Sequence, residues 1–290
     1  MVEAVDELAG VIGEEIVIQS GNTQYAFKHA RAIPFLEHEE MERLLREASV
    51  VILQGGWGTI AEALALGKRV ISIPRNVGAE CNHPQEEVVR ELEKMGCLIG
   101  CYEEKDLPAL YEKALTFYPL PLKKGEAAGT INAYIDALPA KEPKKIYCIS
   151  SHGGHLHELT CAVSGVKGAF SWCTYKTKAT KASFAGRKHH FILDPGTNKF
   201  KFLVNAIQAF WYLIRERPDI VISTGAGIAI PTMLLAKLLF RSKLIFIESA
   251  ANVVAPSKTG RFMYKYADLF LTQWEGLGGC FPKAVFVGVL

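Results

Sequence analysis

The chain has 290 residues, of which 49% are hydrophobic and 22% charged, a composition that fits a folded protein and excludes a disordered or collagen-like one. Its seven cysteines are an odd number without a CxxC pair, which favours reduced thiols in a cytosolic compartment over disulfides or a zinc ribbon. Residues 1–140 carry 13 basic and 22 acidic side chains, and residues 141–290 carry 20 and 8. The halves differ in net charge, −9 against +12, so we expect them to face different partners.

A Pro-containing polar stretch at the charge switch predicts a linker between two domains. We expect the first domain over 1–138, the linker over 139–144 and the second domain over 145–290. The chain opens in a predicted helix over 2–9, so we expect either that the first domain lacks an opening strand or that the sequence is truncated at its start. The residues after Met1 are not typical of a signal peptide, and the uncharged run over 202–214 is too short to span a bilayer.

Short β-branched runs alternate with amphipathic stretches along both halves. In the first half we predict strands over 15–19, 50–54, 69–74 and 97–101 and helices over 39–48, 58–66, 85–95 and 105–116. In the second half we predict strands over 145–150, 190–193, 219–223, 243–248 and 269–273 with helices between them. The alternation predicts an α/β fold of two Rossmann-like lobes with parallel sheets, and ligands at the carboxyl ends of the strands.

The segment Gln54-Gly-Gly-Trp-Gly-Thr-Ile-Ala-Glu62 lies between a predicted strand and a predicted helix. Glycines let a ligand approach the backbone, the helix start offers unpaired N–H groups to a diphosphate, and Glu62 can accept hydrogen bonds from a ribose. The alternative is a tight structural turn with a solvated Glu62. The spacing fits neither GxGxxG nor the P-loop, which disfavours an NAD-dependent oxidoreductase and ATP hydrolysis.

A second polar cluster, over 80–86, precedes the next helix. Asn82, Gln85 and Glu86 can hydrogen-bond to the hydroxyls of a sugar. The alternative is a polar helix start with Pro84 in its first turn.

Together with the segments over 19–25 and 65–75, these motifs resemble the donor-binding subunit of two-component sugar transferases, which is similar to the glycosyltransferase family 28 C-terminal domain. The resemblance covers nearly all of residues 1–117. It implies that the glycine-rich turn and Glu62 hold the UDP moiety and that Asn82, Gln85 and Glu86 face the sugar. The donor residues implied in the turn are Gly55, Gly56, Gly58 and Thr59.

The second half opens with a strand followed by Ser151-His-Gly-Gly-His-Leu-His-Glu158. Backbone N–H groups after Gly153 and Gly154 can meet a diphosphate, and the imidazole of His155 can reach a hydroxyl. A structural His is the alternative. A metal site at His152, His155 and His157 is disfavoured, because residues two apart on a helix face different ways and no further ligand follows.

This loop and the segments over 175–181, 223–231 and 246–261 are similar to the acceptor-side, membrane-recruiting subunit of the same enzymes. The resemblance implies a fused, inverting glycosyltransferase of GT-B architecture with the donor lobe first. It implies His155 as the general base, Glu248 as a residue that orients it or binds acceptor, and Gly153 and Gly154 as binding residues. The donor that the resemblance implies is a UDP-sugar, of N-acetylglucosamine or another hexose, and the implied acceptor is a polyprenyl-diphosphate-linked saccharide. No Asp-x-Asp occurs, so we expect no metal and no cofactor.

Seven basic residues and one acid lie over 176–201, directly before an apolar helix rich in aromatic residues. This pattern fits an anionic membrane surface that contacts Lys176 to Ile214, and we expect a cytoplasmic protein peripheral on the cytoplasmic face. A buried helix beside a solvated loop is the alternative. Nucleic acid is disfavoured, because no motif for it is present. A non-catalytic sugar-nucleotide binder or membrane scaffold is the second reading of the whole chain.

Overall fold

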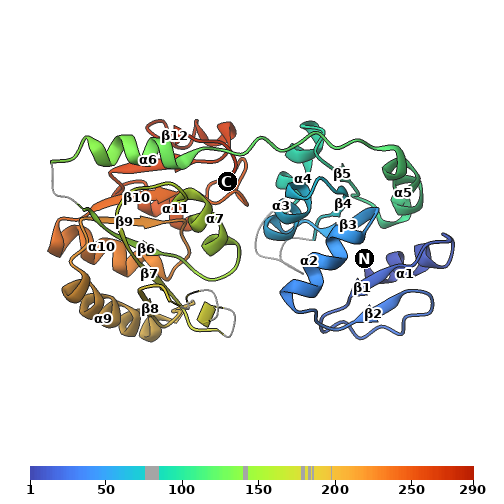
Figure 1. The fold of residues 1–290 in the computed structure, drawn as a ribbon, viewed down its shortest axis with the longest axis horizontal. Coiled ribbons are helices and arrows are strands. Elements are labelled where there is room, and N and C mark those ends of the chain that lie inside the picture. The colour runs from blue at the N-terminus through green and yellow to red at the C-terminus, as the bar shows by residue number, and fades with distance from the viewer. Residues whose placement is uncertain (76–84, 140–142, 178–179, 182–183, 185, 197) are drawn as a thin grey trace. The chain divides into compact units, whose positions relative to one another are not determined.

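The computed structural model describes the chain except for residues 76–84, 140–142, 178–179, 182–183, 185 and 197 (Figure 1). The chain divides into two compact units, Met1–Leu122 and Lys123–Leu290. The boundary lies earlier than the predicted linker because of helix α6 (Ala127–Asp136), which sequence analysis placed in the first domain. Its apolar face, formed by Ala127, Ile131 and Ile135, is buried in the core of the second unit.

The first unit consists of two small parallel sheets covered by helices. Strands β1 and β2 pair with each other, and β3, β4 and β5 form the second sheet in that order. Its elements are α1 (Val2–Ala9), β1 (Val17–Gln19), β2 (Arg31–Ile33), α2 (His38–Glu47), β3 (Val50–Gln54), α3 (Trp57–Ala65), β4 (Arg69–Ile73), α4 (Gln85–Lys94), β5 (Ile99–Gly100), the 3-10 helix η1 (Glu104–Asp106) and α5 (Leu107–Thr116). Side chains of α1, both sheets and α5 share one core.

The second unit has a seven-stranded sheet, and its paired strands are all parallel. After α6 come β6 (Lys145–Ile149), α7 (Gly154–Ala162), β7 (Ala169–Thr174), β8 (His189–Phe191), α9 (Lys199–Glu216), β9 (Ile220–Ser223), α10 (Ala229–Phe240), β10 (Lys243–Ile247), α11 (Lys258–Met263), β11 (Leu269–Thr272), the 3-10 helix η2 (Glu275–Leu277) and β12 (Val285–Phe286). The spatial order is β12-β11-β10-β9-β6-β7-β8. The order therefore reverses between β6 and β9, which is the switch point where ligands bind in doubly wound sheets.

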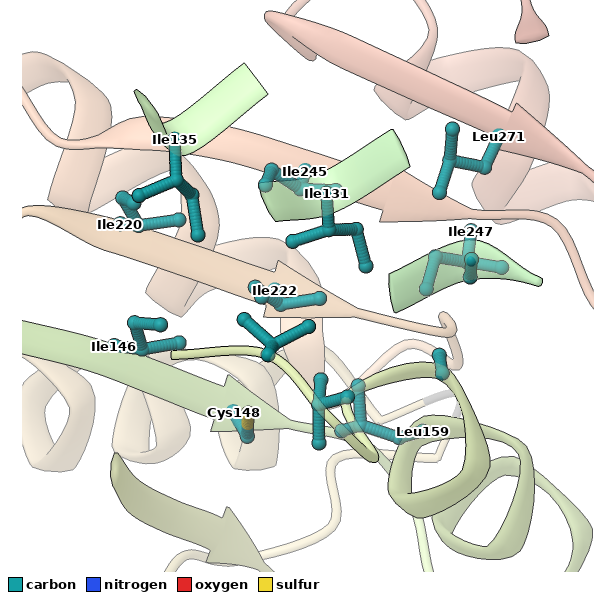
Figure 2. Close-up of a cluster of buried hydrophobic side chains, with 14 of the residues drawn as sticks. Ile131, Ile135, Ile146, Cys148, Leu159, Ile220, Ile222, Ile245, Ile247 and Leu271 are labelled. Atoms are coloured by element: carbon teal, nitrogen blue, oxygen red, sulfur yellow. The ribbon is translucent and has the colours of Figure 1, made fainter. Parts of the chain in front are cut away.

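Side chains alternate between the two faces of this sheet, so each face has its own core. Ile146, Ile222 and Ile247 pack against α6 and α7, and Figure 2 shows Ile131 and Ile135 of α6 over this face. Tyr147, Val221 and Phe246 face α9, α10 and α11 instead. Burial of one such aliphatic side chain contributes about 1.5–3 kcal/mol, so two covered faces stabilise the strand ends that carry the site.

The structure confirms the predicted α/β class and Rossmann-like lobes. The predicted strands and helices lie within a few residues of observed ones. Sequence analysis missed β2, α6, β7 and β12. The six cysteines in the described part of the chain, at positions 97, 101, 148, 161, 173 and 280, form no disulfide.

Candidate active site

The glycine-rich turn of the first unit is shaped by close packing around Gly55. A Cβ atom on Gly55 would lie 2.9 Å from Cβ of Gln85 and 3.1 Å from Cα of Pro74, so a larger residue does not fit without a shift. The Gly55 N–H also donates to the carbonyl of Ile73 at 3.2 Å, which continues the β3–β4 pairing. The turn is thereby fixed at the carboxyl ends of two parallel strands.

Helix α3 begins after Gly56, and no side chain that the structure describes caps its first turn with a hydrogen bond. Its inner face buries Trp57, Ile60, Ala63 and Leu64. The predicted donor residues Gly58 and Thr59 are exposed on the other face, and Glu62 is half-buried one turn later. A Cβ atom on Gly58 would meet nothing within 4 Å. Gly58 and Thr59 thus lie four and three residues before Glu62 on α3, all outside its buried face, and their role in donor binding stays a prediction.

Gln85 begins α4 and lies against the same turn. Its Oε1 atom accepts hydrogen bonds from the backbone N–H of Arg75 at 3.1 Å and from Arg75 Nε at 3.3 Å. Sequence analysis did not single out Arg75, although its place directly after β4 marks it as a residue of the sheet's carboxyl edge. Its guanidinium adds positive charge beside the glycine turn.

The other two residues of the predicted sugar cluster have different outcomes. Glu86 is exposed and forms an ion pair with Arg90 at 2.6 Å, one helical turn later. This geometry is also that of an ordinary helix surface pair. Asn82 lies outside the described residues, so its role stays a prediction.

In the second unit, the predicted Gly153 and Gly154 form the turn between β6 and α7. Gly153 has φ 79° and ψ −138°, a conformation that side chains disfavour, and a Cβ atom on either glycine would meet nothing within 4 Å. Thr224, directly after β9, donates its hydroxyl to the carbonyl of His155 at 2.7 Å. This bond ties the turn to the neighbouring strand at the switch point.

His155 lies in the first turn of α7, with its side chain 32% exposed. Its Nδ1 atom is 3.9 Å from Oε2 of Glu158, whose side chain is 1% exposed. Glu158 Oε1 accepts hydrogen bonds from Ser249 Oγ at 3.1 Å and the Ala250 N–H at 3.0 Å. Burial and the charge of Glu248 outweigh these bonds and raise the pKa of Glu158 to about 8.

Glu248, the carboxylate that sequence analysis paired with His155, follows β10 and is buried. Its Oε1 atom accepts from the Ser249 N–H at 3.2 Å and from Asn252 Nδ2 at 3.3 Å. A Cβ atom on Gly260 would lie 1.7 Å from Oε2, so α11 closes tightly over this carboxylate. Burial raises the pKa of Glu248, against hydrogen bonds from Ser257 and Ser249. Glu158 is the carboxylate whose contact with His155 the structure records. The i,i+3 spacing of these two residues could have predicted the contact.

The neighbouring histidines point to different partners. His152 Nδ1 is 2.5 Å from the hydroxyl of Tyr175, and His157 Nε2 is 3.7 Å from Cys161 Sγ. Within the described part of the chain, no group of three or more His, Cys, Asp or Glu side chains is arranged to hold a metal ion.

Helix α9 has a buried face and an exposed apolar face. Asn205, Ala209 and Leu213 point into the core. Phe200, Leu203, Ile207 and Trp211, which recur every three or four residues, are 73%, 57%, 51% and 59% exposed, and we call these four residues the α9 stripe. Lys199 and Lys201 are exposed at its start. None of the helices that the structure describes has the length and apolarity to cross a bilayer.

Two family models match the chain. Residues 2–128 match the glycosyltransferase family 28 C-terminal domain, and residues 195–290 match the family described as oligosaccharide biosynthesis protein Alg14 like. The first match contains the glycine turn, and the second contains α9, Thr224 and Glu248.

Known proteins similar to the chain agree with the second match. The UDP-N-acetylglucosamine transferase subunit ALG14 of Homo sapiens is 24% identical over 186 residues, covering 53% of this chain and 86% of the relative. The protein of the same name from Saccharomyces cerevisiae is 25% identical over 190 residues, covering 52% and 78%. The crystal structure of MurG from Acinetobacter baumannii is similar with a TM-score of 0.40 and 18% identity over 51% of this chain. The chain spans about half the length of that MurG, namely 46%.

Proposed function

We propose that this chain, a glycosyltransferase that joins a family 28 C-terminal domain to an Alg14-like unit, moves a sugar from a UDP-sugar to a polyprenyl-diphosphate-linked saccharide. The sugar is N-acetylglucosamine or another hexose. N-acetylglucosamine is the first candidate, because the ALG14 relatives are named UDP-N-acetylglucosamine transferase subunits. The observation that carries the proposal is that one chain holds both a glycine-rich turn before α3, where a diphosphate can bind, and His155 beside the point where the strand order of the second sheet reverses.

The first unit supports donor binding. The N-terminus of α3, which Gly56 leaves without a side-chain cap, and its helix dipole favour a diphosphate, and Glu62 lies one turn away to accept from the ribose hydroxyls. Arg75 supplies a cation for the charge that develops on the leaving UDP. We propose that no metal is needed for departure, and addition of EDTA tests this: transfer continues if the proposal is right and stops if a metal is required.

The second unit supports acceptor activation. His155 Nε2 takes the proton of the acceptor hydroxyl as the hydroxyl oxygen bonds to the anomeric carbon. The bond from that carbon to the UDP oxygen breaks in the same displacement, and the electron pair leaves with UDP. One such displacement inverts the anomeric configuration, so an α-linked donor gives a β-linked product.

The membrane is the proposed place of the reaction, on its cytoplasmic face. The α9 stripe offers apolar side chains, and Lys176, Lys181, Lys199 and Lys201 add exposed positive charge near it in sequence. Apolar residues beside cations fit the interface of an anionic bilayer, where a polyprenyl acceptor is dissolved. Lys188 is less available, because it forms an ion pair with Glu216 at 2.6 Å.

The second candidate is a protein that binds the sugar nucleotide without transferring the sugar, which the exposed Gln54 and the structural pairing of Glu86 with Arg90 favour. Release of UDP from a UDP-sugar in the presence of a lipid extract separates the two. Catalysis predicts many UDP molecules per protein, whereas a binder releases none above the background of the His155→Ala variant.

A further inference from the structure

We infer that Glu158 is the positioning residue of His155: its carboxylate accepts a hydrogen bond from Nδ1–H and keeps Nε2 unprotonated, so that Nε2 can accept the proton of the substrate hydroxyl. This inference rests on the proposed function for its consequence in catalysis. Its geometry is independent of that proposal.

The contact between His155 and Glu158 is formed within one helix. Both residues lie on α7, one turn apart, so the helix itself holds His155 Nδ1 and Glu158 Oε2 at 3.9 Å. Glu158 is fixed from the other side, because its Oε1 atom accepts from Ser249 and Ala250 after β10. In the described part of the chain, Oε2 has no hydrogen-bond partner. A buried oxygen in that position has a strong tendency to pair with a donor beside it.

The two buried carboxylates differ in their contacts. Glu248 is held by Asn252 and Ser249 and covered by Gly260, whereas the recorded ion-pair contact of His155 is with Glu158. Its negative charge acts on Glu158 from β10. Glu248 therefore tunes the proton affinity of Glu158 and leaves the orientation of the imidazole to Glu158.

The protonation state of Glu158 decides which ring nitrogen of His155 carries the proton. Burial raises the pKa of Glu158 to about 8, with Glu248 adding to the rise and His157 opposing it. Among the residues that the structure describes, the charged or titratable groups recorded around Glu158 are His155, His157, Glu248 and Cys161. Below that pH the carboxyl group keeps its proton and donates to Nδ1, so the imidazole carries its own proton on Nε2 and cannot act as a base. Above it the carboxylate accepts from Nδ1–H, and Nε2 carries no proton.

The raised pKa of Glu158 leads to an expected pH profile. We expect kcat/KM of the wild-type chain to rise about tenfold per pH unit up to about pH 8 and then level, because kcat/KM reports groups of the free enzyme. Glu158→Gln keeps the acceptor for Ser249 and Ala250 but places an amide N–H toward His155. We expect it to lower kcat at least about 10-fold at pH 9 with little change in KM, whereas removal of the orienting carboxylate costs about 10⁴-fold in a Ser-His-Asp triad. The rise near pH 8 should vanish.

Two matched variants should shift the rising limb of the pH profile of kcat/KM in opposite directions. Glu248→Gln removes the charge that raises the pKa of Glu158, so the limb should shift to lower pH. Ser249→Ala removes a hydrogen bond that lowers this pKa, so the limb should shift to higher pH. Circular dichroism and thermal unfolding show whether each variant is folded. A limb that stays in place in both folded variants would overturn the inference.

A measurement without turnover separates this inference from the proposed function. In the wild-type chain, the NMR resonances of the His155 ring should shift near pH 8 as Glu158 ionises, and this step should be absent in Glu158→Gln. If the step is present but no UDP-sugar gives product, the pairing stands and the proposed function fails. If product forms but the step is missing, or Glu158→Gln keeps the wild-type kcat and pH profile, the pairing is wrong.

Discussion

The hydroxyl of Thr224 donates a hydrogen bond of 2.7 Å to the backbone carbonyl of His155. The two residues are far apart in sequence and follow β9 and β6, the strands between which the order of the seven-stranded sheet reverses. The bond holds the turn that carries His155 against the neighbouring strand end. The position of the proposed base is thus a consequence of the strand order of this sheet.

Replacement of His155 by Ala should lower kcat by roughly 10² to 10⁴, the usual contribution of a general base. UDP affinity should change little, because His155 lies in the second unit and the proposed UDP contacts lie in the first. Steady-state kinetics together with calorimetric titration of UDP measure both quantities. Wild-type turnover in a folded variant would remove His155 from the mechanism.

Replacement of Glu62 by Ala should weaken UDP binding by about 1–3 kcal/mol, the cost of losing a hydrogen bond to a charged group. Isothermal titration calorimetry measures this directly. Glu91→Ala is the control, because Glu91 pairs with Lys94 on α4 and should leave the affinity unchanged. Equal affinities for all three proteins would contradict the donor assignment.

Replacement of Gly58 by Ala should affect the stability of the fold and the affinity for UDP differently. A Cβ atom there meets nothing, and Ala is the better helix former by about 0.5–1 kcal/mol, so the free protein should be as stable or slightly more stable. UDP should bind more weakly, because the methyl group projects toward the proposed diphosphate.

By contrast, Gly55→Ala should destabilise the fold by about 1–3 kcal/mol through its clash with Gln85 and Pro74. Denaturant unfolding and UDP titration on both variants check these signs, and unweakened UDP binding by Gly58→Ala would place the diphosphate elsewhere.

Asp6 should make the first unit sensitive to acid. The residue is buried in α1, and despite this burial, hydrogen bonds from the N–H groups of Ala30, Lys28 and His29 and from Tyr25 lower its pKa to about 2. A lowered pKa means that ionised Asp6 stabilises the fold above about pH 4, and this stabilisation is lost as pH falls toward 2. Asp6→Asn should lower the unfolding temperature at pH 7 and should differ less from the wild type as the pH approaches 2. A difference that is constant with pH would contradict this.

Replacement of Lys176, Lys181, Lys199 and Lys201 by Gln should weaken binding to phosphatidylserine vesicles by a few kcal/mol, at about 1 kcal/mol for each charge near the surface. Binding should also fall with salt, because exposed charges are screened beyond about 10 Å at 0.1 M. Gln at Lys105 and Lys113 of the first unit is the control and should have no effect. Sedimentation across a salt series measures this, and binding indifferent to salt would assign the attachment to the α9 stripe alone.

Sequence patterns predicted those parts of the fold that have strong local signals. β6, β9 and β10 are continuous buried runs, and the glycines that precede α3 and α7 mark strand-to-helix turns. β7 was missed because Ser171 and Thr174 interrupt its apolar pattern, although both are buried. Helix α6 was missed because it opens with small residues beside the predicted linker, and only the packing of Ile131 and Ile135 on the second sheet assigns it to that unit.

The site shows the same limit. His155, the glycine turns and Glu62 could be named as candidates from the sequence, because each lies directly at the end of a predicted strand or in the helix that follows it, and their roles stay predictions. From the sequence, Glu248 was expected to orient His155 or bind acceptor, and the contact of His155 with Glu158 was missed although its i,i+3 spacing could have predicted it. The burial of Glu248 under α11 depends on packing that no local pattern shows. Arg75 was not identified as a site residue because its link to Gln85 joins segments that are separate in sequence.

If this chain alone carries both the donor and the acceptor function, as we propose, it should transfer the sugar without a second protein. This proposal is tested most directly by mixing the purified chain with radiolabelled UDP-N-acetylglucosamine and a short-chain polyprenyl-diphosphate-linked saccharide, without any partner protein, and separating the lipid products. The account predicts a lipid extended by one β-linked labelled sugar with one UDP released per transfer, and no such product from His155→Ala. UDP binding without any labelled lipid, across a panel of UDP-hexoses and lipid-linked acceptors, would contradict it.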